Sequence, residues 1–204
     1  MRYVLLALLL TITSPVWAGI GTVAENKGSA CEIQRGKTKL TGVKGADIEM
    51  LDTYTTGACS ASITFKDDTK VKINENSRLL IDDFVFDPKK SDAGKLVLKA
   101  AMGTVRYASG QIAKNNPQSV DIKTPSASIA VRGTDFSMTV DEMGRSLVIL
   151  LPSCPFGFND IAKDCKTGEI FVKTDMGVVH LNKPFQSTYV HSREAAPGKP
   201  NILQ

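Results

Sequence analysis

The sequence predicts an all-β protein of many short strands, built either as a roll-like β-solenoid or as a sandwich, after a cleaved signal peptide. Two patterns support this fold class. Apolar and polar residues alternate with a period of two in one segment after another, as expected of half-buried strands. The segments recur at intervals of roughly ten residues and are separated by Gly, Pro, Asp or Asn, which is typical of all-β folds.

The strands can be followed in order along the chain. "ASITFKDDTKVKIN" sets two apolar residues against two more across the Asp67–Asp68 turn, so we expect a hairpin. Residues 93–102 would also suit a helix, but Gly94 and Gly103 bracket them too closely, and we expect a strand. Further strands are predicted in "SRLLIDDFVFDP", "SVDIKTP", "RSLVILLP", "GEIFVKTDMGVVHLN" and "QSTYV".

Residues 1–18 have the features of a Sec-type signal peptide that is cut after Ala18. Arg2 precedes a short apolar run, and polar residues, a proline and small residues follow. The run is too short for a good membrane span, so we expect no transmembrane segment in the mature chain. We therefore expect the mature protein to be exported to the periplasm or to the outside of the cell.

The mature chain is expected to form one domain over residues 19–190. Its core motifs occupy residues 20–140, a disulfide loop occupies 152–168, and closing strands occupy 169–190. Residues 191–204 are charged, rich in proline and poor in apolar residues until the last three, so they predict a flexible tail.

The stretch "IKTPSASIAVRGTDFSMTV", residues 122–140, contains a change of phase. Ile129 and Val131 before it occupy odd positions, whereas Phe136, Met138 and Val140 after it occupy even positions. A straight strand would turn one set away from the core. We therefore predict a β-bulge or sharp corner at Arg132–Asp135, with Gly133 supplying a positive φ. Arg132 then either pairs with Asp135 or caps carbonyls at the bend. The corner is interpreted as structural, with a contact surface as the alternative.

Four cysteines, an even number in an exported chain, favour disulfides. Nearness in sequence pairs Cys31 with Cys59 and Cys154 with Cys165, and each closed loop would stabilise the protein by about 3 kcal/mol. Alternation places Cys31 and Cys59 on the core side of neighbouring strands. A zinc site is the rival interpretation, but the chain has no CxxC spacing and only two histidines.

The charge pattern argues against nucleic acid as a partner. The chain has 25 Lys and Arg against 21 Asp and Glu, and the two signs are interspersed instead of clustered on one side. Such a pattern is typical of a solvated surface.

No set of residues predicts catalysis, a cofactor or a metal. His180 and His191 have no serine or cysteine in a triad context, and no Gly-rich loop leads from a strand into a helix. Asn76 and Ser77 are interpreted as a structural turn, because such side chains bond nearby backbone. We therefore expect a protein that is not an enzyme.

Four motifs follow one another along the chain: "GTVAENKGSACEIQRG", "DDTKVKINENSRLLIDDFVFDP", "MGTVRYASG" and "IKTPSASIAVRGTDFSMTV". The last is the most specific: Thr124 and Pro125, a few small residues, an apolar pair, and Arg-Gly-Thr followed by Asp135 and Phe136. Together these motifs resemble the FecR domain family of exported bacterial proteins. The resemblance implies an all-β, solenoid-like or roll-like exported domain.

The best-understood members of that family relay a signal from an outer-membrane iron-siderophore receptor to a cytoplasmic anti-sigma segment. They carry a membrane span where this chain has the predicted signal peptide. The resemblance therefore implies a protein-binding or regulatory module whose partner is another envelope protein or a cell-surface component. A structural or glycan-binding envelope protein is the alternative.

The predicted disulfide loop, "PSCPFGFNDIAKDCKTG", is longer than a connection between two strands requires. Loops of this kind often carry function. Phe156 and Phe158 are its aromatic residues, and they either cap the core or contact a partner as apolar anchors.

Overall fold

The computed structural model of the protein describes residues 19–90, 93–155, 157 and 159–203. The strands in chain order are β1 (Gly21–Gly28), β2 (Cys31–Arg35), β3 (Thr38–Gly42), β4 (Asp47–Ile48), β5 (Thr53–Thr56), β6 (Cys59–Phe65), β7 (Lys70–Ile73), β8 (Ser77–Val85), β9 (Lys95–Ala108), β10 (Val120–Lys123), β11 (Ser128–Arg132), β12 (Asp135–Val140), β13 (Ser146–Leu151), β14 (Glu169–Thr174), β15 (Gly177–Leu181), β16 (Gln186–Val190) and β17 (Asn201–Ile202). Two short helices, α1 (Gln111–Asn115) and α2 (Ile161–Asp164), and a 3-10 turn at Pro117–Ser119 complete the secondary structure of the described residues.

The strands form two ladders that share β9. Ladder A runs in the order β4, β1, β6, β7, β9, β12, β13, β16, β17. Ladder B runs in the order β3, β2, β5, β8, β9, β10, β11, β14, β15. Pairing is antiparallel except between β9 and β10. The all-β prediction is confirmed, and the described strands make an open mixed sheet.

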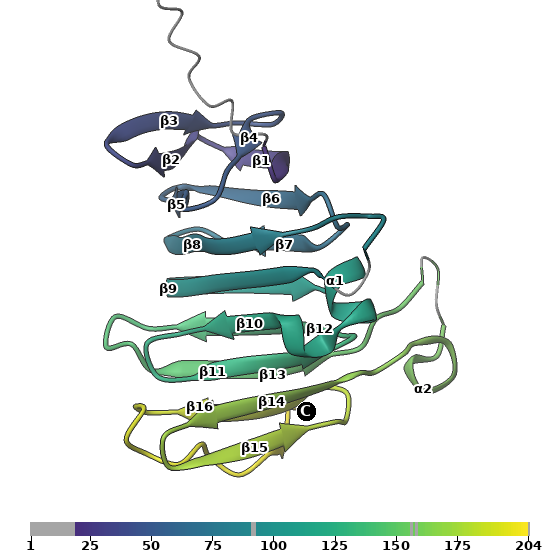
Figure 1. Cartoon of the computed structure of the whole chain (residues 1–204). Helices are drawn as coiled ribbons and strands as arrows, with labels where there is room; N and C mark the ends of the chain where they lie inside the picture. The colour runs from purple at the N-terminus through teal and green to yellow at the C-terminus, as the bar shows by residue number, and fades with distance from the viewer. Residues whose placement is uncertain (1–18, 91–92, 156, 158, 204) are drawn as a thin grey trace, which may run out of the picture.

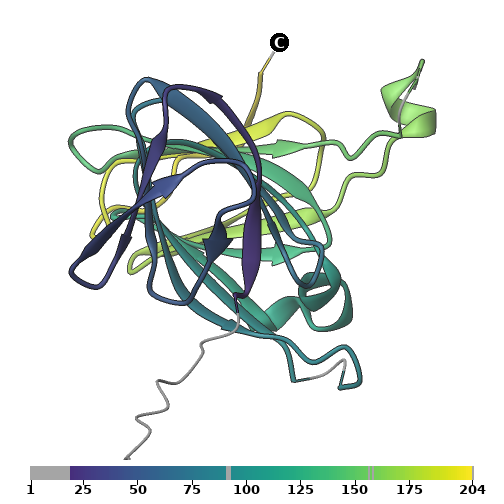
Figure 2. The ribbon, with the colours of Figure 1, turned by 90° about the horizontal axis from the view of Figure 1, so that it is seen from above.

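The strands of the two ladders lie one above another in a stack, and the chain runs through the stack from one end to the other (Figure 1). The N-terminal strands lie at one end, and β14 to β16 lie at the other. Seen along the stack, strands lie around a shared interior, and the segment that carries α2 projects outward (Figure 2). The hairpin of β6 and β7 is confirmed, with Ile63 opposite Val71. Residues 95–102 are strand, as expected, and not helix.

The interior is one apolar core to which both ladders contribute. Its largest fully buried side chains include Tyr54, Phe65, Tyr107 and Phe136. Phe136 on β12 lies directly opposite Tyr107 on β9, with ring centroids 5.4 Å apart. Burying one such ring stabilises the fold by about 2–3 kcal/mol. Phe136, singled out by the sequence motif, is therefore a core residue.

β9 passes from ladder B to ladder A at Gly103, which has a φ of +84°. A Cβ atom there would lie 2.5 Å from the Cα of Ser77, so only glycine fits. Ser77 is buried, its N–H donates to Thr56 Oγ1 at 2.8 Å, and its Oγ accepts from the Thr104 N–H at 2.9 Å. Asn76 before it has a φ of +54°. The Asn76–Ser77 turn therefore holds the crossing of β9 in place.

Cys31 and Cys59 are bonded, as predicted. They do not lie on neighbouring hydrogen-bonded strands, because Cys31 starts β2 in ladder B and Cys59 starts β6 in ladder A. Both side chains are at most 4% exposed. The bond therefore joins the two ladders across the core near the N-terminal end of the stack.

The segment after β16 differs from the flexible tail that the sequence predicts. Asn201–Ile202 forms β17 and pairs with β16. The Gly198 N–H donates to the Tyr189 carbonyl at 2.9 Å, and Thr188 Oγ1 donates to the Gly198 carbonyl at 2.6 Å. The open edge of β16 offers unpaired backbone groups, and the last residues satisfy some of them.

The predicted signal peptide, residues 1–18, lies outside the described residues. Within the described part of the chain, no helix has the length and apolar content that a membrane crossing would need.

Candidate functional site

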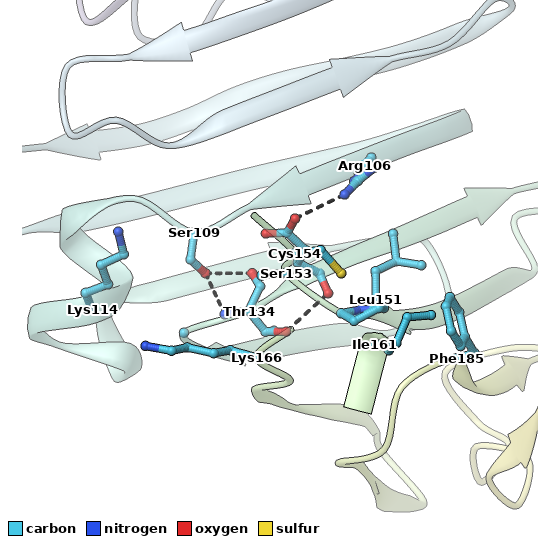
Figure 3. A pocket seen from close by; sticks show the side chains of 13 residues that line it. Arg106, Ser109, Lys114, Thr134, Leu151, Ser153, Cys154, Ile161, Lys166 and Phe185 are labelled. Carbon is cyan, nitrogen blue, oxygen red and sulfur yellow. Dashed lines mark hydrogen bonds and ion pairs between the residues drawn. The ribbon is translucent and has the colours of Figure 1, made fainter. Parts of the chain in front are cut away.

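The Arg132–Asp135 corner joins β11 of ladder B to β12 of ladder A. Gly133 has a φ of +57°, the backbone conformation that the change of phase requires. Thr134 is buried, its N–H donates to Ser109 Oγ at 3.0 Å, and Ser109 Oγ donates to the Thr134 carbonyl at 2.8 Å. The end of β9 thus fixes the corner (Figure 3).

Arg132 and Asp135 do not pair with each other. Arg132 donates to Glu169 Oε1 at 2.7 Å across β14, and Asp135 accepts from Arg106 at 3.1 Å across β9. The corner sends the two side chains to different ladders, where each meets a partner on a neighbouring strand. Arg132 and Asp135 therefore each have an ion-pair partner on the surface.

His180 Nε2 is hydrogen-bonded to Glu169 Oε2 at 2.7 Å. The hydrogen bond from Arg132 makes the largest contribution to lowering the pKa of the Glu169 carboxyl, and the bond with His180 makes the next largest. The His180 ring stacks on Phe171, its cross-strand neighbour, at a centroid distance of 4.4 Å. His180 thus serves a surface network on β14 and β15, in agreement with its interpretation as a strand residue.

The disulfide loop, residues 152–168, leaves the stack after β13 and returns at β14. Ser153 and Lys166 exchange backbone hydrogen bonds of 2.8 and 3.0 Å, and Cys154 is bonded to Cys165 next to them. This second predicted disulfide is confirmed. Phe156 and Phe158 lie outside the described residues, so the choice between core cap and partner contact stays a prediction.

The tip of the loop is shaped by its acidic residues. Asp160 caps α2 by accepting from the Ala162 N–H at 2.9 Å. Asp164 accepts from the N–H groups of Asp160 and Asn159, and these backbone bonds lower the pKa of its carboxyl. These bonds join the two sides of the loop beyond the disulfide.

The loop returns directly against the corner at Gly168. A Cβ atom on Gly168 would lie 2.6 Å from both the Arg132 carbonyl oxygen and the Thr134 Cβ. Such a separation is below any normal contact between these atoms, so the two segments approach closely only because residue 168 is glycine. Corner and loop therefore form one packed unit.

A cleft of about 750 Å³ lies between this corner and the loop (Figure 3). It receives side chains from the end of β9, from α1, from the corner, from both arms of the loop and from the turn before β16. Its lining residues are Arg106, Ser109, Lys114, Gly133, Thr134, Asp135, Leu151, Pro152, Ser153, Cys154, Ile161, Lys166 and Phe185.

The sequence indicated only part of this cleft. The sequence marks Gly133, Thr134, Asp135 and the loop, but it does not mark Arg106, Lys114 or Lys166. Each of these basic residues is isolated in the sequence, without a cluster or spacing that marks it. Only the return of the loop against the corner brings them around one hollow.

Thr124 and Pro125, the other motif residues, lie away from the cleft. The Thr124 hydroxyl accepts from Ser146 Oγ at 2.8 Å and from the Ala127 N–H at 3.0 Å. Ser146 and Ser126 hydroxyls are 2.6 Å apart in the same buried cluster. This part of the motif therefore ties the turn after β10 to β13.

In the described part of the chain, no three side chains of His, Cys, Asp or Glu converge in a way that would hold a metal ion.

A family model for FecR protein matches residues 52–151. Two crystal structures of a candidate anti-sigma factor from Parabacteroides distasonis have a similar fold. One is 14% identical with a TM-score of 0.51 and the other is 15% identical with a TM-score of 0.50. The matches cover 74% and 72% of this chain but 59% and 58% of the crystallised chains, less than two thirds of their length. No curated protein matches the chain.

The matched residues include the Asn76–Ser77 turn, the crossing at Gly103 and the whole Arg132–Asp135 corner. The match ends at Leu151, immediately before the disulfide loop begins. The chain is a FecR-domain protein, with the domain matched over residues 52–151.

Proposed function

We propose that this chain is a non-enzymatic regulatory module of the FecR type, which acts in the periplasm by binding another envelope protein. The FecR match and the two disulfides support an exported or envelope protein. The similarity to the candidate anti-sigma factor supports the fold, and its name agrees with a regulatory role. We also propose that the stack is best described as roll-like, with two ladders around one core.

One observation carries the binding role: the cleft is built jointly by the family domain and by a loop outside the matched residues. The corner at 132–135 belongs to the match, and the loop at 152–168 does not. Binding residues are often found on loops that a rigid scaffold positions. Here the scaffold is the buried Thr134 and its bonds to Ser109. The cleft, of about 750 Å³, is within the range of ligand sites in proteins, and a short segment of a partner protein is its proposed occupant.

Photo-crosslinking in the native cell envelope tests this role. A photoreactive residue at Ser153 faces the cleft, and the matched control places it at Lys37, in the exposed turn between β2 and β3. Crosslinks to one protein from position 153, and none from position 37, would support the proposal. Recovery of glycan alone, or equal labelling from both positions, would contradict it.

A glycan-binding role is the second candidate, and a different hollow favours it. A hollow of about 590 Å³ on the outer face of ladder B is lined by Phe171, Ala130 and Arg132, with Asn116 and Gln118 at its rim. An aromatic face beside side-chain amides provides apolar and polar groups together, as ligand sites do. Sedimentation with purified peptidoglycan tests it, and loss of binding in Phe171→Ala would support it.

A further inference from the structure

We propose that the cleft between the corner and the disulfide loop binds an extended acidic segment of the partner protein. The inference rests on the proposed function, because it names the chemistry of the partner that the cleft would hold. The cleft has three cationic residues in its lining, Arg106, Lys114 and Lys166. Asp135 is the only carboxylate among the described residues that line it.

The charges of this lining are only partly balanced. Arg106 is engaged by Asp135 at 3.1 Å. Among the described residues, neither the Lys114 nor the Lys166 ammonium group has an ion-pair partner within 4.0 Å, although both border the same hollow. Positive charge therefore remains in a concave site, where it attracts an anion more strongly than it would on a convex surface.

The cationic residues and the apolar residues occupy different parts of the cleft (Figure 3). Lys114 and Lys166 lie on one side in this view, and Leu151, Ile161 and Phe185 lie on the other, with Arg106 above them. Successive side chains of an extended peptide point to opposite sides. A peptide that alternates acidic and apolar residues can therefore turn its carboxylates towards the lysines and its apolar side chains towards the apolar residues.

The strand beside the cleft adds positive charge. Lys72 on β7 lies directly opposite Arg106 on β9 in the register of ladder A, and both side chains are exposed. Like charges at directly opposed positions destabilise a sheet. Asp135 offsets the charge of Arg106, whereas Lys72, which lies outside the cleft lining, has no ion-pair partner within 4.0 Å among the described residues. The charge of Lys72 therefore adds to the attraction of an anionic ligand.

The test uses the purified, disulfide-bonded protein and a fluorescein-labelled ten-residue peptide of alternating Glu and Val. The control peptide carries Gln at every Glu position. Fluorescence anisotropy should detect binding of the Glu peptide, weaker binding as salt is raised, and no comparable binding of the Gln peptide. No binding of the Glu peptide at 1 mM, or equal binding of both, would overturn the inference.

Two double variants locate the interaction. Lys114→Gln with Lys166→Gln should weaken binding of the Glu peptide about three- to tenfold, because two charge contacts are lost. Lys37→Gln with Lys44→Gln, equally exposed but at the other end of the stack, should leave affinity unchanged. Equal weakening by both pairs would mean a general charge effect and would contradict a site in the cleft.

A competition experiment separates a peptide from an anionic polysaccharide. Alginate, a polyuronate, presents carboxylates without a peptide backbone or apolar side chains. If alginate displaces the peptide at an equal or lower carboxylate concentration, the inferred occupant is wrong. If position 153 crosslinks to a protein in the envelope but the Glu peptide does not bind, this inference fails and the proposed function stands.

Discussion

The two disulfides contain the same bond but have different surroundings. Cys31–Cys59 closes 28 residues, is almost fully buried and joins the two ladders. Cys154–Cys165 closes 11 residues, is half-buried and lies in a loop outside the stack. The first bond therefore acts on the core of the whole domain, whereas the second acts on the shape of one cleft. The position of a crosslink in the fold therefore decides whether it stabilises the domain or organises a surface.

Removing the first disulfide should have the largest effect. Cys31→Ala with Cys59→Ala is expected to cost about 3–4 kcal/mol of unfolding free energy, measured by urea denaturation. Cys154→Ala with Cys165→Ala should cost less than about 1 kcal/mol, because the loop can open without unfolding the stack. The chain-entropy model alone predicts similar losses for both loops. Equal losses would therefore mean that burial does not distinguish the two bonds.

The contact between loop and corner should be the next most sensitive point. Gly168→Ala places a Cβ atom 2.6 Å from the Arg132 carbonyl and should cost about 3 kcal/mol, because backbone must shift. Gly157→Ala is the control in the same loop, since a Cβ there meets nothing within 4 Å. The expected loss for this control is about 1 kcal/mol, and it comes only from the φ of +77°, which is unfavourable for a residue with a Cβ atom. Equal melting curves for the two variants would contradict the packed junction.

At the corner itself, the backbone should matter more than the charged side chain. Gly133→Val is expected to cost about 2 kcal/mol, because a β-branched residue is strained at a φ of +57°. Arg132→Ala should cost about 0.5 kcal/mol, because its side chain is 66% exposed in the ion pair with Glu169. Urea melts of both variants measure these losses. A parent-like melt for Gly133→Val, with partner binding lost in Arg132→Ala, would reverse the structural assignment of the corner.

The smallest effect concerns the acid response of Glu169. Arg132 and His180 lower the pKa of the folded carboxyl below its ordinary value, so the unfolded chain binds the proton more readily. The resulting stabilisation is present above the ordinary pKa and is lost as pH falls through the folded pKa. Glu169→Gln should therefore reduce the drop in urea midpoint between pH 7 and pH 3.

The neighbouring loop provides a matched control for that measurement. Asp164 also has a lowered pKa, but its partners are backbone N–H groups of the loop tip. Asp164→Asn should change the acid response of the global melt less than Glu169→Gln, because the tip can open locally. A larger change for Asp164→Asn would indicate that the loop and the stack unfold together.

The sequence alone determined which residues face the core and where the strand pattern breaks. Alternation predicted the β6–β7 hairpin, and the phase change before Phe136 predicted the corner with its positive φ at Gly133. These features are local. A period of two fixes the side of a strand on which each residue lies, and a break in that period requires a specific backbone conformation.

The tertiary structure alone decided which distant residues meet. The sequence offered Asp135 as a partner for Arg132, but the corner sends them to Glu169 and Arg106 on different ladders. Nothing in the sequence indicated that the terminal residues pair with β16. Nothing in it indicated that Lys114 and Lys166 line the same cleft. The physical reason is that alternation carries no information on which strands become neighbours, since that depends on pairings between residues far apart in the chain.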